Sequence, residues 1–325
     1  MLKKLILSAS ALAISACAYP TTTLAHEHES HEHEAHAHEA AESTASGPAL
    51  WRVADEDTTI YLFGTVHLLP EGLDWLSPTV EQALTSSDQF VSEIDTSLIP
   101  EYDPASGTPP PPELMAILQM QMGLAQLTTG GTLRDLMNEE DRAEYETAMT
   151  DLGLPVAAFD GFEPWFAIIA MSQVAMTQAG LDASNGVERQ LDHLIEGKDR
   201  AAFETVEQQM GFFDGLPMES QLTMLDESVE GFAVMREMFD QMVGEWVEGD
   251  PDGLAAIIND AMAADPILYD TLLTQRNTNW AGWIDDRLDQ PGTVFIAVGA
   301  GHLAGQDSVQ DFLTERGITA ERIEY

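Results

Sequence analysis

Two stretches near opposite ends of this 325-residue chain repeat one pattern, a run of β-branched and aromatic residues followed by Gly-x-x-His-Leu. They are Tyr61-Leu-Phe-Gly-Thr-Val-His67 and Val294-Phe-Ile-Ala-Val-Gly299-Ala-Gly-His302. Each predicts a buried strand that enters a glycine bend and then presents a histidine. One such histidine is most simply a hydrogen-bonded core residue. Two matching strand ends, far apart in sequence, instead indicate two arms of one site.

The N-terminal residues predict export. Lys3 and Lys4 precede an apolar run, residues 5–16, that is too short to span a bilayer. The run ends in Ile14-Ser-Ala-Cys17, which resembles a bacterial lipobox. We therefore expect residues 1–17 to be a signal segment and Cys17 to anchor a periplasm-facing outer-membrane lipoprotein. The alternative is cleavage after Ala25, which leaves a soluble periplasmic protein.

Residues 18–48 are expected to be a disordered linker rich in His, Glu and Ala. Six of the nine histidines lie there, and residues 26–48 contain no large apolar side chain that could build a core. The tract is either a weak, multivalent binder of divalent metal or a solvated spacer. Because the linker need not hold a catalytic ion, we treat it apart from the paired histidines.

Composition excludes several function classes. The formal net charge is -43, from 13 Lys plus Arg against 56 Asp plus Glu, so neither nucleic acid nor an anionic lipid surface is an expected partner. The chain has no Gly-x-Ser-x-Gly motif and no glycine-rich phosphate loop, and its only cysteine lies in the export segment. Serine, cysteine and nucleotide-dependent mechanisms therefore lack their parts.

Residues 49–325 are expected to form one α/β domain with a mixed, largely parallel central sheet built from N- and C-terminal segments. A hairpin formed by 51–54 and 59–63 delivers His67. Ser77-Pro78 then caps a short helix, and 89–95 forms a strand. A parallel return of that strand beside the His67 strand places Glu93 and Asp95 at the same sheet edge.

A mostly helical insertion is expected at about 100–290. The expected helices cover 113–127, 132–152, 163–179, 186–196, 218–247 and 253–264. Arg200–Val206 interrupts them with strand character, and Glu204 stands near its end. The chain then finishes with a returning strand at 293–298, a helix at 307–316 and a strand at 318–323.

These motifs, in this order, resemble those of the TraB/PrgY/GumN family, which is related to the Tiki metalloproteases and more distantly to ChaN and the erythromycin esterases. The resemblance covers about residues 50–325. It is carried by Leu62-Phe-Gly-Thr-Val-His67, Ser92-Glu93-Ile-Asp95, Glu163-Pro164-Trp165, Gly186-Val-Glu188 with Gly197-Lys198, Phe203-Glu204-Thr-Val-Glu-Gln208, Gln275-Arg276-Asn277 and Val298-Gly-Ala-Gly-His302-Leu. In two places the chain departs from the family pattern: Glu188 stands where Asp is usual and Phe203 where Leu is usual.

The resemblance implies a divalent-metal hydrolase fold, with peptide cleavage in some members. Two neutral imidazoles and one carboxylate make a three-ligand set that leaves positions open for water and substrate, so His67, Glu93 and His302 are the candidate metal ligands. The ion is manganese, cobalt or zinc, and a peptide or protein is the expected substrate. The alternative for Glu93 is a sheet-edge carboxylate paired with Arg276 or another cation.

Three further residues are candidates for catalysis. Glu204 is a general base, a supporting carboxylate or a fourth ligand. Arg276 either clamps a substrate carboxylate or oxyanion, or forms a salt bridge that orients a ligand, and Asn277 holds a peptide carbonyl. His193 is expected to be a surface or packing residue. A non-catalytic protein of the same fold, which sequesters a peptide or a metal, is the second functional hypothesis.

Overall fold

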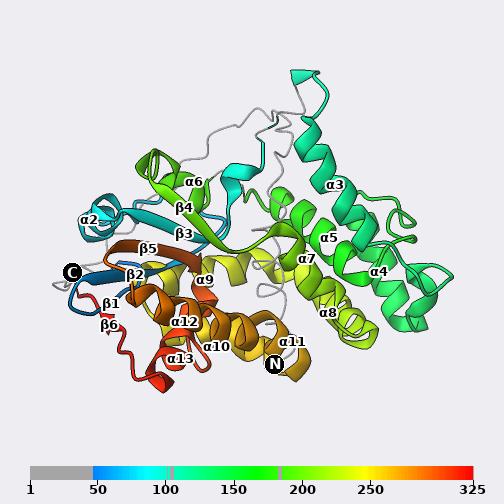
Figure 1. Ribbon diagram of the computed structural model, residues 1–325. Helices are drawn as coiled ribbons and strands as arrows, with labels where there is room; N and C mark the ends of the chain where they lie inside the picture. Colours follow the sequence, from blue (N-terminus) through cyan, green and yellow to red (C-terminus); the bar gives the residue numbers. More distant parts are fainter. Residues whose placement is uncertain (1–46, 101, 103–105, 182–184, 325) are drawn as a thin grey trace, which may run out of the picture.

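The computed structural model describes residues 47–325 except 101, 103–105, 182–184 and 325. The expected signal segment, Cys17 and all but the last two residues of the linker lie outside this part. Six strands form one sheet in the order β4-β3-β5-β2-β1-β6 (Figure 1). The strands are β1 (Leu50–Ala54), β2 (Thr58–Thr65), β3 (Gln89–Ile94), β4 (Asp199–Glu204), β5 (Gly292–Gly299) and β6 (Glu321–Arg322).

Four strands of the sheet are parallel, and the edge formed by β1 and β6 is antiparallel. Strands β2, β5, β3 and β4 run in one direction, whereas β1 pairs antiparallel with both β2 and β6. The mixed, largely parallel α/β fold is therefore confirmed. Thr65 pairs with Gly299 and Ile94 with Glu204, so four strands end at one edge of the sheet. Groups that follow those ends are brought together there.

Two expectations about the strands are corrected. We expected β3 to return directly beside β2, but β5 lies between them and pairs with both. The connection from β2 to β3, which contains helix α2 (Pro78–Ser86), therefore passes over β5. The final strand, expected at 318–323, is only the two residues of β6, which pair with Trp51 and Arg52 of β1.

The helices follow the capping signals of the sequence. Ser77 accepts a hydrogen bond from the Val80 backbone N–H at the start of α2, as expected of an N-cap. The α-helices of the described chain are α2, α3 (Pro112–Leu124), α4 (Glu139–Asp151), α5 (Pro164–Gln178), α6 (Val187–Leu191), α7 (Val206–Asp214), α8 (Met218–Gly231), α9 (Met235–Glu248), α10 (Pro251–Met262), α11 (Pro266–Tyr269), α12 (Gln275–Leu288) and α13 (Val309–Glu315).

Two of the expected long helices are broken. The expected helix at 132–152 divides into a 3-10 turn, Leu133–Leu136, and α4, because Asn138 caps the backbone N–H groups of the next turn. The expected helix at 218–247 divides into α8 and α9 at a 3-10 turn, Phe232–Val234. None of the helices in the described ranges combines the length and the apolar character that a bilayer span needs.

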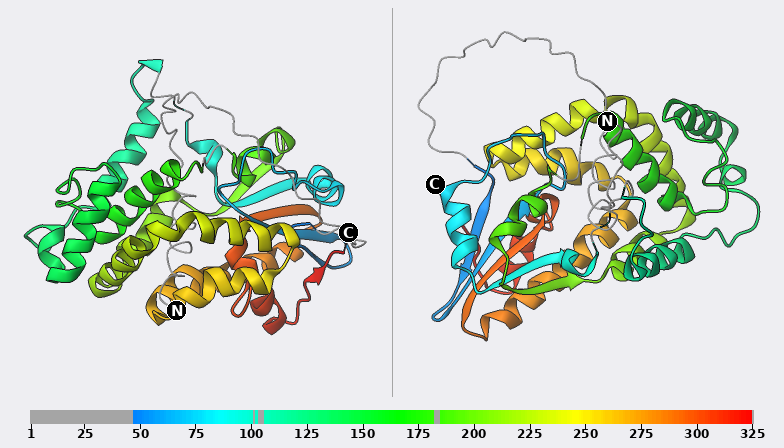
Figure 2. Two further views of the ribbon diagram at one scale, coloured as in Figure 1. Left: turned by 180° about the vertical axis from the view of Figure 1, so that it is seen from behind. Right: turned by 90° about the horizontal axis from the view of Figure 1, so that it is seen from above.

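Helices cover both faces of the sheet because the strand side chains alternate between two cores. Phe63 and Phe295 belong to the larger core, with α2, α5, α8, α9 and α10, whereas Leu62 and Ile296 belong to the smaller one, with α12 and α13. The right-hand view of Figure 2 shows the sheet between α9, in yellow, and α12, in orange. Helices α3, α4, α5, α7 and α8 lie beyond the carboxyl ends of the parallel strands (Figure 1).

One set of contacts fixes helix α9 at the carboxyl ends of the parallel strands. Trp246 of α9 packs edge-on against Phe63 and at a tilt against Trp75, and its indole N–H donates to the Gly64 carbonyl over 2.8 Å. This contact holds α9 over the end of β2.

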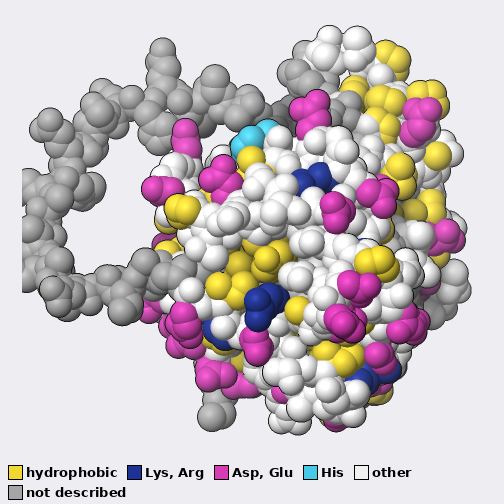
Figure 3. Space-filling model, turned by 60° about the vertical axis from the view of Figure 1, so that its left-hand side comes forward, with side chains coloured by type: hydrophobic (Ala, Val, Ile, Leu, Met, Phe, Trp, Pro, Cys, Tyr) yellow, Lys and Arg dark blue, Asp and Glu magenta, His cyan; other side chains and the backbone are white. Residues whose placement is uncertain are grey.

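The negative charge of the chain is spread over its surface. Acidic side chains are scattered there and Lys and Arg are few, as the face in Figure 3 illustrates, so the charge forms a solvated exterior.

Candidate functional site

The two Gly-x-x-His bends lie against each other at the ends of the neighbouring strands β2 and β5. A Cβ on Gly64 would lie 3.0 Å from the Cα of Ala300, so this approach requires glycine. His67 follows β2 by two residues, and His302 lies on the 3-10 turn Ala300–Leu303 that follows β5. The two histidines, which we expected to be two arms of one site, therefore follow the ends of neighbouring strands.

His67 is oriented by a carboxylate. Its Nδ1 lies 2.8 Å from the Glu188 carboxylate, which comes from α6, and the backbone N–H of Val187 donates to the Val66 carbonyl. Burial lowers the pKa of His67, but the Glu188 carboxylate outweighs it, so the pKa is raised above its usual value. Nδ1 therefore carries the proton that Glu188 accepts, and Nε2 is the ring atom left for other partners.

His302 is held as a neutral imidazole. The amide nitrogen of Asn277 donates to the Asp307 carbonyl over 2.8 Å, which turns its oxygen towards His302 Nδ1, 2.6 Å away. Nδ1 must then carry the proton, and Nε2 accepts a hydrogen bond from Arg276 Nη1 at 3.1 Å. Burial and the neighbouring guanidinium lower the pKa of His302 to about 3. Asp307 is the one non-glycine residue with a left-handed backbone, φ 57°, among the residues described.

Glu93, near the end of β3, is buried and ionised. Its Oε2 accepts hydrogen bonds from Arg276 Nη2 at 2.6 Å and from Gln209 at 2.8 Å, and its Oε1 accepts one from the Gly299 backbone at 2.7 Å. Burial disfavours the carboxylate, but Arg276, the two histidines and the Gly299 backbone N–H together outweigh this effect and lower the pKa of Glu93 to about 2. Asp95, in contrast, caps the turn after β3 by accepting from the Ser97 backbone.

Arg276 joins every part of the network. The Glu204 carboxylate accepts from its Nε and Nη2, at 2.7 and 2.9 Å, and the Leu272 carbonyl accepts from its Nη1 at 3.2 Å. With the bonds to Glu93 and His302, all five donors of the guanidinium have partners. Arg276 follows a π-helical turn, Asp270–Thr274, at the start of α12, and such turns are frequent at functional sites.

The structure has the salt bridge that we weighed as the alternative for Glu93 and Arg276. It also places Asn277 against His302, with both ends of its amide already bonded. Glu204, at the end of β4, accepts hydrogen bonds from Arg276 on both oxygens, and Gln209 is also a hydrogen-bond partner of its carboxylate. Burial raises the pKa of Glu204 above its ordinary value, although Arg276 opposes this.

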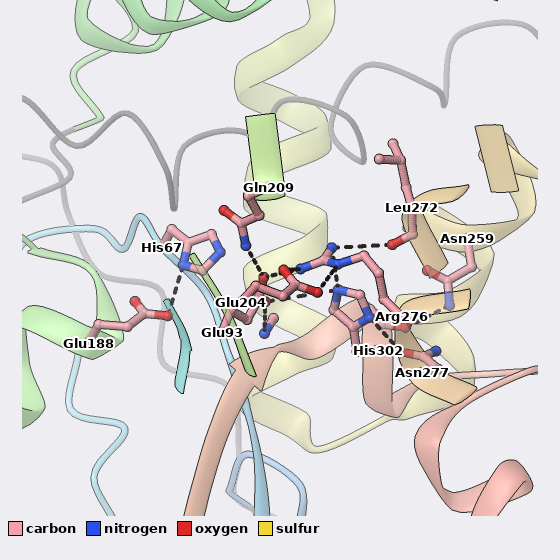
Figure 4. A network of polar contacts seen from close by, with 12 residues as sticks. His67, Glu93, Glu188, Glu204, Gln209, Asn259, Leu272, Arg276, Asn277 and His302 are labelled. Atoms are coloured by element: carbon pink, nitrogen blue, oxygen red, sulfur yellow. Dashed lines mark hydrogen bonds and ion pairs between the residues drawn. The ribbon is translucent and has the colours of Figure 1, made fainter. Parts of the chain in front are cut away.

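The three candidate ligands all lie close to Gly299. A Cβ built on Gly299 would lie 3.0 Å from Glu93 Oε1, 3.9 Å from His67 Nε2 and 3.7 Å from His302 Cδ2. Figure 4 shows His67 with Glu188 on one side of the two glutamates, and His302 with Arg276 and Asn277 on the other. Glycine at this position keeps the space between them open.

Imidazole and carboxylate donors suit a divalent cation, and both histidines have partners on Nδ1 that leave Nε2 directed inwards. Over the residues described, however, no three His, Cys, Asp or Glu side chains already lie together as metal ligands do. The reason is Arg276, which bonds to both His302 Nε2 and Glu93 Oε2. The donor set therefore fits a divalent ion in type, Glu93 and His302 also fit it in protonation, and Arg276 competes for these two.

A narrow pocket adjoins this point. His67, Gly299 and His302 line one side, and apolar side chains from α9, α10 and the π-helical turn line the other. Asn259 of α10 also lines it. The pocket places open space directly beside the two imidazoles.

Sequence reasoning missed three members of this region. We noted Glu188 only as a departure from a family pattern, and we did not single out Gln209 or Asn259. Their signal is weak, because one carboxylate or amide on a helix is ordinary surface chemistry. Gln209 and Asn259 are both buried, and the side-chain oxygen of each has no hydrogen-bond partner. His193 is exposed on the 3-10 turn Asp192–Leu194, as expected of a surface residue.

Comparison with known proteins gives one family. The model of the TraB/PrgY/gumN family matches residues 49–322. A protein from Treponema pallidum (strain Nichols), described as an uncharacterized protein, is 21% identical over 281 residues, which cover 82% of this chain and 80% of that protein. No solved structure matches the chain, so the likeness to ChaN and the erythromycin esterases stays a prediction. The family match spans the sheet, both Gly-x-x-His bends and the Arg276 network, and the chain belongs to the TraB/PrgY/GumN family.

Proposed function

We propose that this chain is a divalent-metal-dependent hydrolase that cleaves peptide-like bonds in the bacterial cell envelope. The observation that carries the proposal is the convergence of His67, His302 and the ionised Glu93 on Gly299. Manganese, cobalt and zinc all suit imidazole and carboxylate donors. The chemistry that such an ion supplies when bound is activation of water and polarisation of a carbonyl group.

The surrounding residues support this chemistry by fixing the donors. Glu188 and Asn277 each bond to the Nδ1 of one histidine, which is how proteins usually set the tautomer and ring orientation of a metal-binding imidazole. Arg276 keeps Glu93 ionised in a buried place and keeps His302 neutral. Both protonation states are those that a cation requires of its ligands.

Glu204 is the residue that we propose to accept a proton from the attacking water. Its raised pKa makes it a stronger base than an exposed glutamate, and the bonds from Arg276 to both of its oxygens hold the carboxylate in place. Arg276 holds both Glu204 and Glu93, so it sets the position of the base relative to that of a ligand.

A second function is favoured by one observation. Arg276 already satisfies Glu93, Glu204 and His302, so the network is complete without an ion. A non-catalytic member of the fold that holds a peptide in the adjoining pocket would need nothing more. Metal content and turnover, measured on the same preparation, separate the two functions.

The experiment uses purified residues 49–325, which lack the His-rich linker, with the variants His67→Ala and His302→Ala, and with His193→Ala as a matched control on an exposed histidine. We expect one divalent ion per chain by elemental analysis and calorimetry, lost in the first two variants and retained in the control. Cleavage of a peptide library should require the ion and stop with chelator. Unchanged metal affinity in either His67→Ala or His302→Ala would refute the site, and bound metal without turnover would favour the binder.

A further inference from the structure

We propose that the pocket beside His67 and His302 binds a single aliphatic side chain of a peptide, and that Asn259 accepts the backbone N–H of that same residue. The inference rests on the proposed function in one respect: the peptide bond that is cleaved is taken to be next to the residue whose side chain fills the pocket. It assigns a substrate class, peptides with a leucine-like residue at that position, and a specificity pocket that recognises it.

The apolar wall is the first observation. Met242 of α9, Ile258 and Met262 of α10, and Leu273 of the π-helical turn surround the pocket, and each is buried. The volume available to water-sized molecules is about 40 Å³. Such a volume holds about three waters, which is roughly the space of an aliphatic side chain of three or four carbons. Water there has few polar partners, so an apolar side chain replaces it favourably.

The unpartnered oxygen of Asn259 is the second observation. Its amide nitrogen donates to the Gly301 and Ala304 carbonyls, at 2.9 and 2.8 Å, and these two bonds fix which end of the amide is the oxygen. The oxygen is buried without a hydrogen-bond partner, and Asn259 is only 3% exposed. A buried acceptor without a hydrogen bond has lost its contact with water and gained nothing in exchange, so a ligand that donates to it gains affinity.

Gly301 shows which way that oxygen faces. A Cβ on Gly301 would lie 3.1 Å from Asn259 Oδ1 and 3.3 Å from Ile258 Cγ2, and all three residues line the pocket. The acceptor and the apolar wall therefore meet at the same bend that carries His302. In Figure 4, Asn259 lies on the side of the network where His302 and Arg276 are. A peptide residue entering here presents its side chain to the wall and its N–H to Asn259.

The test measures binding on chelator-treated protein, so that it does not depend on turnover. The probes are N-acetyl-leucinamide, N-acetylglycinamide and N-acetyl-phenylalaninamide, and a form of the first that is methylated on the leucine nitrogen. Dissociation constants of about 1 mM are expected for ligands of this size, and NMR titration can measure them. The leucine probe should bind at least about tenfold more tightly than the glycine probe, and methylation of its nitrogen should remove about tenfold.

The variant Met242→Ala enlarges the pocket, and Met238→Ala is its matched control, a buried methionine one turn earlier on α9 that does not line the pocket. Met242→Ala should raise the affinity for the phenylalanine probe relative to the leucine probe by about tenfold. Met238→Ala should leave this ratio unchanged. Equal binding of the leucine and glycine probes, or equal shifts in the two variants, would overturn the pocket assignment. Equal binding of the methylated probe would overturn the role of Asn259. Selective binding by a chain that hydrolyses no peptide, with or without metal, would leave the pocket standing and refute the hydrolase.

Discussion

Replacing Arg276 with methionine tests whether its guanidinium stabilises the buried carboxylates of Glu93 and Glu204. The change keeps an unbranched apolar stem and removes the only cation that contacts Glu93 and Glu204 among the described residues. Glu93 is 3% exposed, so it is left as a buried carboxylate without a charge partner. Breaking a buried pair in this way costs about 3–5 kcal/mol. With an unfolding entropy of about 2.1 cal/mol/K per residue, the unfolding midpoint of a domain of this size should fall by about 5–9 °C.

The loss should depend on pH with a definite sign. In the natural chain the pKa of Glu93 is about 2, below its value in the unfolded chain, so its stabilising contribution is present above about pH 4.5 and is lost only as the pH falls towards 2. In Arg276→Met that contribution is gone, and protonating the carboxylates relieves the penalty. The difference between the two proteins should therefore be greatest at neutral pH and shrink below about pH 5.

The same variant tests the competition with metal. Removing the guanidinium frees His302 Nε2 and Glu93 Oε2, so added zinc or manganese should raise the unfolding midpoint more in Arg276→Met than in the natural chain. The assay is calorimetry, or thermal unfolding followed by circular dichroism, at pH 4 to 7.5 with metal or with chelator.

Arg134→Met is the matched control. Arg134 also contacts two carboxylates, those of Asp160 and Glu146, but a fifth of its side chain is exposed and it lies outside the site. Its loss should be smaller and unaffected by metal, because water replaces the missing partner. If Arg276→Met costs no more than Arg134→Met, or if its cost is the same at pH 4 and pH 7, the buried charges are not what Arg276 stabilises.

Three further outcomes are expected. Glu204→Gln should retain the ion and lower peptide turnover by about a hundred- to ten-thousand-fold, with loss of the acidic limb of the pH–rate profile; lost metal would make Glu204 a ligand, and normal turnover would remove it from the mechanism. Burial and neighbouring acids raise the pKa of Glu227 to about 7, above its unfolded value, so its ionisation opposes folding and stability should rise as the pH falls from 8 to 5. Glu227→Gln should raise the unfolding midpoint at pH 8 but not at pH 5, whereas a like effect from Glu237→Gln, at an exposed position on α9, would contradict this cause. Mass spectrometry of the exported protein should find a lipid-modified Cys17 at the N-terminus, and a start at His26 would instead indicate a soluble form.

The local part of the fold could be read from the sequence because its causes are local. Runs of β-branched and aromatic residues identified the strands that contain Leu62 and Ile296, since such side chains favour an extended, buried strand wherever they occur. Ser77-Pro78 marked the start of α2 because a cap bonds to N–H groups within its own first turn. The repeated Gly-x-x-His pattern likewise placed both histidines beyond strand ends.

Only the tertiary structure decided which strands are neighbours and which partners the polar groups have. The insertion of β5 between β2 and β3 joins segments from opposite ends of the chain, and no pattern within β3 specifies it. Arg276 and Glu93 are 183 positions apart, and their ion pair depends on the packing of α12 against the sheet. Asn277 could be read as a substrate contact until its amide was found between His302 and Asp307. A side chain's type limits what it can bond, whereas its partners are set by contacts that residues distant in sequence make when the chain folds.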